Sequence, residues 1–148
     1  MTSQEAFDKA LAHMRAQGER SVDTSTGDCL YRSDDGLACA VGCLIPDGTW
    51  EVAVSEWERI HGDRPCNAKG LHLNSYGIAE LVSDDVGVGI KRHLSGLELP
   101  FLQRLQMLHD PRANWRDGRF AAEGLAQRLA REYGLDYTPP AGATKVGE

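Results

Sequence analysis

The clearest hydrophobic pattern along the chain is ELPFLQRLQMLHD, residues 98–110, where apolar side chains recur every three residues. The stripe consists of Leu99, Phe101, Leu102, Leu105 and Leu108. This spacing places the apolar side chains on one face of a helix. Pro100 suits a first turn, and Asp110-Pro111 ends the segment. The pattern predicts an amphipathic helix with one buried face.

A second stripe lies near the N-terminus, in QEAFDKALAHMRAQG. Phe7, Leu11 and Met14 follow one another at spacings of four and three, which is typical of a helix. We expect Ser3 to cap this helix and Gly18 to end it. The polar residues 18–28 that follow have the composition of a loop.

The C-terminal segment DGRFAAEGLAQRLAREY predicts a last amphipathic helix over residues 117–133, ended by Gly134. Its inward positions are Phe120, Leu125, Leu129 and Tyr133. Residues 138–148 are rich in Pro and Gly, which indicates a flexible tail after a globular domain of residues 1–137.

The stretch CLYRSDDGLACAVGCLIPDG, residues 29–48, is harder to interpret. Two short β-compatible runs flank a turn that ends at Gly36, which is consistent with a small hairpin. The apolar run LACAVGCLI packs equally well as a helix, and periodicity does not separate the two over so short a run. We favour a strand over 29–32 and a helix from Leu37 to Leu44 that Pro46 ends.

Residues 47–62 also carry two patterns. Trp50, Val52 and Val54 alternate as in a strand, whereas VSEWERIHG is typical of a helix that ends at Gly62. DRPCNAKG then has the composition of a loop. Taken together, the patterns predict a mostly α, small α+β fold. It is a single compact domain of four to five helices, with a short β element near 29–32 and a second one over 50–54 as an option.

Composition limits the function classes. A net charge of −6 argues against nucleic-acid binding, which needs a basic face. No segment approaches the roughly 18 apolar residues of a membrane span, and the N-terminus has no apolar signal region. We therefore expect a cytoplasmic protein, no membrane partner and reduced cysteines.

The cysteines do not form a typical zinc motif. Cys29, Cys39, Cys43 and Cys66 are spaced C-x9-C-x3-C-x22-C. Structural zinc sites usually contain closely spaced pairs that aim two thiolates at one ion. Buried free cysteines behave as small hydrophobic residues. We predict no metal site and no cofactor, with a zinc-stabilised domain as the alternative.

A thiol nucleophile is a second candidate. Cys39 falls near the start of the expected 37–44 helix, where the helix dipole favours a thiolate. His109 and Asp110 could then serve as base and orienting carboxylate. The alternative is structural, because a His in a last helical turn binds free carbonyls and an Asp before Pro turns the chain.

Tyr31, Arg32 and Asp47 are the candidate binding residues of the 29–48 stretch. A tight core needs neither Tyr31 nor Arg32 as filling, so either could reach a ligand or partner. The structural interpretation, which we favour, is a packed Tyr31 with its hydroxyl bonded and an Arg32 paired to Asp34, Asp35 or Asp47.

The central motif C-x-Y-R-x-x-x-G-L-x-C-A-V-G-C-L-I-P-D, with F-D-K-x-x-x-H before it and L-Q-x-x-H-D and a Trp after it, resembles a family of small uncharacterised proteins encoded by tailed bacteriophages and prophages. Where members of that family often continue with a Tyr and a Glu-Gly pair, this chain has TWEVAVSEW. The residues that carry the resemblance are Phe7, Asp8, His13, Cys29, Tyr31, Arg32, Gly36, Leu37, Cys39, Ala40, Gly42, Leu44, Ile45, Pro46, Asp47, Leu105, Gln106, His109, Asp110 and Trp115.

The resemblance implies an accessory protein that acts inside the bacterial host, but it supplies no reaction. We therefore expect a non-enzymatic binder or modulator of a host factor, such as a host-defence component, or of a small molecule. The alternatives are a small hydrolase or transferase that uses Cys39, His109 and Asp110, and a zinc-stabilised structural domain.

Overall fold

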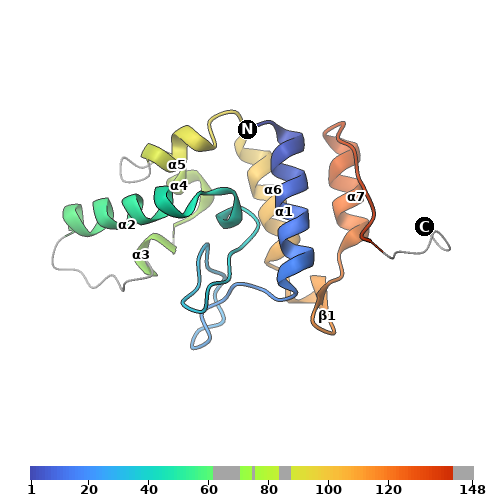
Figure 1. The fold of residues 1–148 in the computed structure, drawn as a ribbon, viewed down its shortest axis with the longest axis horizontal. Helices are drawn as coiled ribbons and strands as arrows, with labels where there is room; N and C mark the ends of the chain where they lie inside the picture. The colour runs from blue at the N-terminus through green and yellow to red at the C-terminus, as the bar shows by residue number, and fades with distance from the viewer. Residues whose placement is uncertain (62–70, 75, 84–87, 142–148) are drawn as a thin grey trace.

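The computed structural model describes residues 1–61, 71–74, 76–83 and 88–141 (Figure 1). It is a mostly helical single domain with a small two-stranded antiparallel sheet, which confirms the expected fold class. The elements are α1 (Ser3–Gln17), η1 (Gly42–Leu44), α2 (Asp47–His61), α3 (Leu71–Asn74), α4 (Ile78–Leu81), α5 (Val88–His93), α6 (Leu99–His109), η3 (Arg112–Asn114), β1 (Trp115–Arg116), β2 (Arg119–Phe120) and α7 (Glu123–Glu132).

Three of the longer helices, α1, α6 and α7, run side by side at one end of the molecule, and α2 extends away from them (Figure 1). Helix α6 contacts α1, α4 and α7, so it occupies the centre of the packing. Helix α2 packs on α5. The predicted stripe of α6 faces inward, with Phe101, Leu102 and Leu105 almost fully buried.

Helix α1 forms where its apolar stripe predicted it, with Phe7, Leu11 and Met14 buried. The N-cap is Thr2 rather than Ser3: the Thr2 hydroxyl accepts from the Glu5 amide, and the Glu5 carboxylate accepts from the Thr2 amide. Gly18 ends the helix in the left-handed conformation with φ 77°, as expected.

The helix expected over Leu37–Leu44 is wrong, because only Gly42–Leu44 form a single 3-10 turn. In such a helix the Val41 amide would bond the Leu37 carbonyl, but it donates to Gln106 Oε1, and the Leu37 carbonyl accepts from the Ser33 amide. The Ala38 amide donates to Gln17 Oε1. A side chain at Gly42 would place its Cβ 2.1 Å from the Tyr31 carbonyl oxygen, so the chain crosses itself closely here.

The strand expected over 29–32 is reduced to two isolated bridges, Val22 with Cys29 and Arg32 with Ala38. The second bridge closes the turn that contains Gly36, which has φ 86°. This part of the chain is therefore a hairpin-like loop held by tertiary hydrogen bonds instead of a regular strand.

The optional strand over 50–54 is also wrong, because these residues lie within α2. Trp50, Ala53, Val54 and Trp57 are buried at helical spacing, whereas Val52 is 63% exposed. The helical pattern of VSEWERIHG therefore extends back to Asp47.

The last helix begins at Glu123, six residues later than expected. Asp117 and Gly118 both have positive φ values, 53° and 73°, and form the turn between β1 and β2. Phe120 is buried as expected, but on β2, and Leu125 is 43% exposed on α7 instead of facing inward.

The segment after α7 folds back on α1. Gln4 Nε2 donates to the Asp136 carbonyl oxygen, and the Asp136 amide donates to Gln4 Oε1. Arg15 donates to the Thr138 carbonyl at 2.9 Å. The expected tail begins at 138, and residues 142–148 of it lie outside the described residues. The loop expected over 63–70, which contains Cys66, also lies outside them.

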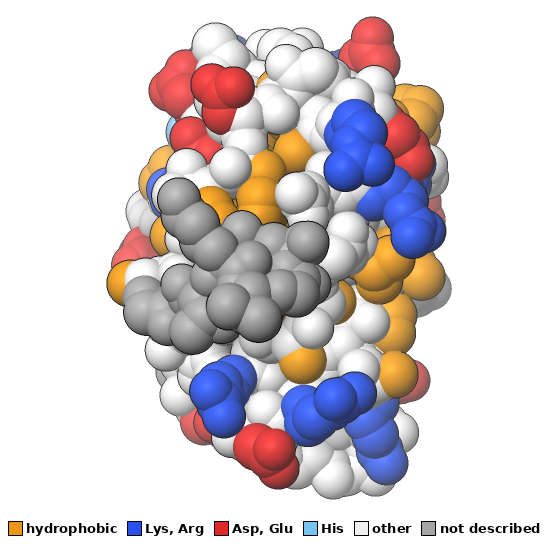
Figure 2. Space-filling model, turned by 90° about the vertical axis from the view of Figure 1, so that its right-hand side faces the viewer, with side chains coloured by type: hydrophobic (Ala, Val, Ile, Leu, Met, Phe, Trp, Pro, Cys, Tyr) orange, Lys and Arg blue, Asp and Glu red, His pale blue; other side chains and the backbone are white. Residues whose placement is uncertain are grey.

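The outer face beside α7 carries both signs of charge, with Lys and Arg side chains interspersed among Asp and Glu and hydrophobic patches (Figure 2). Within the described residues, the helices are too short or too polar to cross a bilayer.

Candidate functional site

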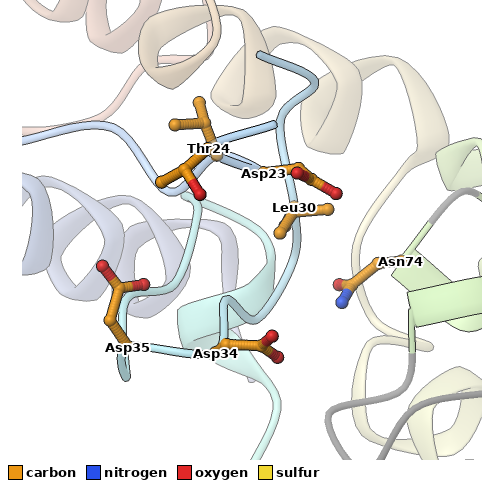
Figure 3. Close-up of a pocket in the computed structure, with 7 residues that line it drawn as sticks. Asp23, Thr24, Leu30, Asp34, Asp35 and Asn74 are labelled. Carbon is orange, nitrogen blue, oxygen red and sulfur yellow. The ribbon is translucent and has the colours of Figure 1, made fainter. Parts of the chain in front are cut away.

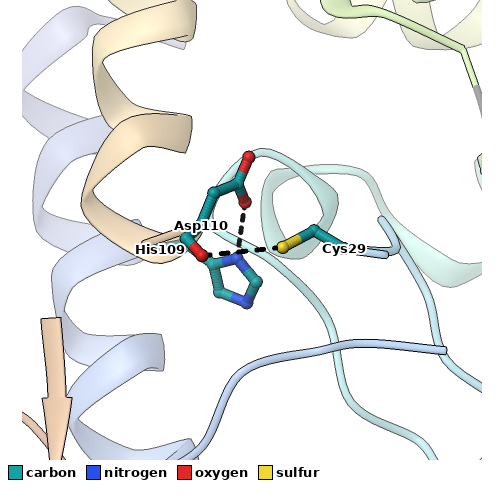
Figure 4. A group of neighbouring side chains, drawn as sticks. All are labelled: Cys29, His109 and Asp110. Carbon is teal, nitrogen blue, oxygen red and sulfur yellow. Dashed lines mark hydrogen bonds and ion pairs between the residues drawn. The ribbon is translucent and has the colours of Figure 1, made fainter. Parts of the chain in front are cut away.

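The structure separates the expected thiol from its expected partners. Cys39 is fully buried, and its Sγ accepts from the Gly42 amide at 3.2 Å. Burial raises the pKa of this thiol to about 12. A different cysteine, Cys29, lies beside His109 and Asp110, with one donor atom from each of the three residues within 4.8 Å of the others (Figure 4).

His109 is a fully buried bridge between two parts of the chain. Its Nε2 lies 2.9 Å from the backbone nitrogen of Ser21, and its Nδ1 lies 2.8 Å from Asp110 Oδ1. The Trp115 indole packs edge-on against the ring, 5.7 Å between centroids, and donates to the His109 carbonyl. The imidazole is thus held from three sides.

These contacts fix where the ring carries its proton. A backbone N–H is a donor only, so Nε2 must present its lone pair to Ser21. The ring proton therefore resides on Nδ1, which donates to the Asp110 carboxylate. In this tautomer Nδ1 has no lone pair with which to take a proton from Cys29 or to bind a metal ion. The donor atoms of the trio are close enough to share a ligand, but in this tautomer the trio is a hydrogen-bonded cluster in which Nδ1 carries a proton.

Cys29 is half-buried and faces the backbone of Asp110. Its Sγ lies 3.8 Å from the Asp110 carbonyl oxygen and 3.7 Å from Arg20 Nη1. Burial, followed by the negative charge of Asp110, raises the pKa of the Cys29 thiol to about 11, although Arg20 acts in the opposite direction. The thiol is therefore protonated near neutral pH.

Asp110 is held by one of its two carboxylate oxygens. Oδ1 accepts from His109 and, at 2.7 Å, from Gln106 Nε2. Gln106 is itself buried and accepts the Val41 amide at 3.1 Å through its own oxygen. Asp110 Oδ2 receives no hydrogen bond from an N–H group of any residue that the structure describes, although the Cys29 thiol lies beside the carboxylate, and the side chain is 32% exposed.

Asp110 lines a cavity of about 430 Å³, which we call the α6 pocket. The described residues of its wall come from three places: Cys29 and Tyr31, then Asn74, Tyr76, Gly77 and Ile78, and then Gln103, Gln106, Met107 and Asp110 in and after α6. The residues that matter for its chemistry are Cys29, Tyr31, Tyr76, Ile78, Met107 and Asp110. Tyr31 is fixed in the wall because its hydroxyl donates to the Tyr76 carbonyl at 2.8 Å.

Arg32 and Asp47 lie apart from the α6 pocket, beside a cavity of about 450 Å³ that Trp50 and Glu51 also line. Arg32 forms an ion pair with Asp47 and donates to the Gly42 and Ile45 carbonyls. The bonds from Arg32 hold the pKa of the Asp47 carboxyl below its usual value. Of the three expected binding residues, the structure brings Arg32 and Asp47 together, and it places Tyr31 in the α6 pocket.

A third cavity, of about 340 Å³, is acidic (Figure 3). Asp23, Asp34 and Asp35 line it together with Thr24, Leu30 and Asn74. Asp23 Oδ1 accepts from Ser25 and Thr26, and Asp35 accepts from the Ser33 hydroxyl. These two carboxylates therefore serve to hold local turns.

Sequence reasoning singled out Asp110 but missed Cys29, Asn74 and Gln106 as neighbours of the pocket. Asn74 pairs with both the amide and the carbonyl of Arg32, at 2.9 and 2.7 Å. Gln106 belongs to the L-Q-x-x-H-D motif, and its spacing of four from Asp110 on a helix was a usable signal.

We predict that Gln106→Leu lowers the free energy of unfolding by about 1–3 kcal/mol, because it leaves the buried Val41 N–H without a partner. Gln103→Leu is the matched control, since Gln103 is exposed on the same helix. Urea unfolding measures the free energy of unfolding of the two variants and of the parent chain. Equal stability of the two variants would show that the Gln106 bonds contribute little.

We also predict that Cys29 is poorly reactive in the folded protein. With its pKa near 11, the thiolate fraction near neutral pH is small, so iodoacetamide should modify it on the order of a hundredfold more slowly than an exposed thiol. The rate should keep rising as the pH approaches 11. Peptide mapping by mass spectrometry reads out each cysteine, and denaturant provides the fully reactive control. Rapid labelling of native Cys29 at neutral pH would contradict the assignment.

Neither a protein-family model, nor a curated protein, nor a solved structure matches this chain.

Proposed function

We propose that this chain is a non-enzymatic binding protein and that the α6 pocket is its ligand site. Following the resemblance of its central motif, we place it among the accessory proteins of bacteriophages and prophages that act in the bacterial cytoplasm. In this proposal it acts by holding a small molecule, and in doing so it modulates a host process.

The observation that carries the proposal is the construction of the α6 pocket. Its volume of about 430 Å³ falls in the range of small-molecule sites. Its wall is aromatic and aliphatic, from Tyr31, Tyr76, Ile78 and Met107, with an oriented carboxylate at Asp110. Because Tyr31 and Asp110 are already bonded to the surrounding chain, little ordering is needed when a ligand enters.

Bond-making chemistry has weaker support. Cys39 is fully buried, and the Cys29 thiol has a raised pKa, so neither is an activated nucleophile. Both nitrogens of His109 are engaged in hydrogen bonds. The same tautomer argument weakens the zinc alternative, because a ligand nitrogen must be free of its proton.

The motif residues behind the resemblance support the fold more than a reaction. Gln106 and His109 bond the backbone of Val41 and Ser21, and Arg32 bonds the 42–45 turn. A motif of this kind preserves the architecture around the pocket, which is consistent with a binding role.

Small-molecule screening tests the proposal directly. A library of bacterial metabolites is tested against the folded chain by ligand-observed NMR. We expect saturable hits that Met107→Trp weakens at least tenfold, since a bulky indole at position 107 occupies the pocket. Leu125→Trp is the matched control, because Leu125 is an exposed apolar residue on α7.

Hits that survive Met107→Trp unchanged, or a screen without any saturable hit, would contradict the proposal. Thermal unfolding of both tryptophan variants, compared with the parent chain, checks that they remain folded.

A further inference from the structure

We propose that the α6 pocket selects a small organic cation, an amine or amidinium group on an aromatic or aliphatic body, and that the Asp110 carboxylate receives the cationic group. This inference rests on the proposed binding function and names its ligand class.

The first support is the orientation of Asp110. Gln106 and His109 both bond to Oδ1, at 2.7 and 2.8 Å, so the carboxylate cannot rotate without losing two hydrogen bonds. Oδ2 is left without a hydrogen bond from any N–H donor in the described part of the chain, and the residue lines the pocket. A fixed carboxylate oxygen with free lone pairs is an acceptor for a charged N–H donor.

The second support is the charge around the pocket. Among the described residues that line it, Asp110 is the only charged one. Arg20 donates to the Asp110 backbone carbonyl at 2.8 Å and forms no ion pair with the Asp110 carboxylate. The acidic cavity with Asp23, Asp34 and Asp35 shares Asn74 with the α6 pocket, so further carboxylates lie near it.

The third support is the apolar part of the pocket wall. Tyr31, Tyr76, Ile78 and Met107 offer aromatic, aliphatic and thioether surface, which suits the apolar body of a ligand. Aromatic faces also attract a cation that passes over them. A carboxylate beside an apolar wall matches an aryl-alkylamine better than a sugar or an anion.

The test compares three probes of similar size: phenethylamine, 2-phenylethanol and phenylacetate. Titration of the folded chain is followed by amide NMR shifts at Gly77, Ile78 and Met107. We expect the amine to bind about five- to tenfold more tightly than the alcohol, as for one charge-assisted hydrogen bond. Phenylacetate should bind most weakly.

Asp110→Asn should abolish the preference for the amine. The asparagine oxygen can still accept from Gln106 and His109, so this variant preserves the internal bonds. Asp34→Asn is the matched control: it removes the same charge from the acidic cavity and should keep most of the preference. The comparison of the three probes on the unaltered chain does not depend on either variant.

Equal binding of amine and alcohol, tighter binding of phenylacetate, or a preference that survives Asp110→Asn would overturn the cation assignment. In each of these cases pocket binding persists, and the proposed function stands. Absence of shifts with all three probes also overturns the assignment, and the metabolite screen then decides separately whether the pocket binds any ligand.

Discussion

The imidazole of His109 is the contact on which the rest of the site depends. It accepts a hydrogen bond from the Ser21 amide and donates one to the Asp110 carboxylate, so a single buried ring joins the loop after α1 to the end of α6. Because a buried backbone N–H needs a partner, this contact fixes the ring's tautomer. In this tautomer Nδ1 has no lone pair for a base or ligand role, and its proton is donated to Asp110 Oδ1.

The loop over residues 18–41 depends on similar bonds from side chains. Its β-pairing is limited to two isolated bridges, and while several of its amides bond within the loop, others find partners on the helices around it. Gln17 of α1 holds Ala38, Gln106 of α6 holds Val41, and Asn74 of α3 holds Arg32. The pocket lies where this loop meets α6, and its shape therefore follows from bonds that are far apart in sequence.

The difference between patterns that are local in sequence and bonds between distant residues explains which elements the sequence could predict. The stripes of α1 and α6 are local patterns, and both helices form as expected. The 37–44 segment does not become a helix because its amides bond to residues that sequence periodicity cannot reveal. Asp110 was identifiable from its motif. That Cys29 lies beside Asp110, where we expected Cys39, depends on the close crossing of the chain at Gly42 and on the Val22–Cys29 bridge.

The position of the proton on His109 tests the account most directly. Long-range ¹H–¹⁵N NMR of the folded chain distinguishes a protonated ring nitrogen from one that carries a lone pair. The account predicts a protonated Nδ1 and an unprotonated Nε2 that accepts from Ser21. An unprotonated Nδ1 with the proton on Nε2 would contradict it, because the ring would then be free to act as a base toward Cys29 or to bind a metal ion.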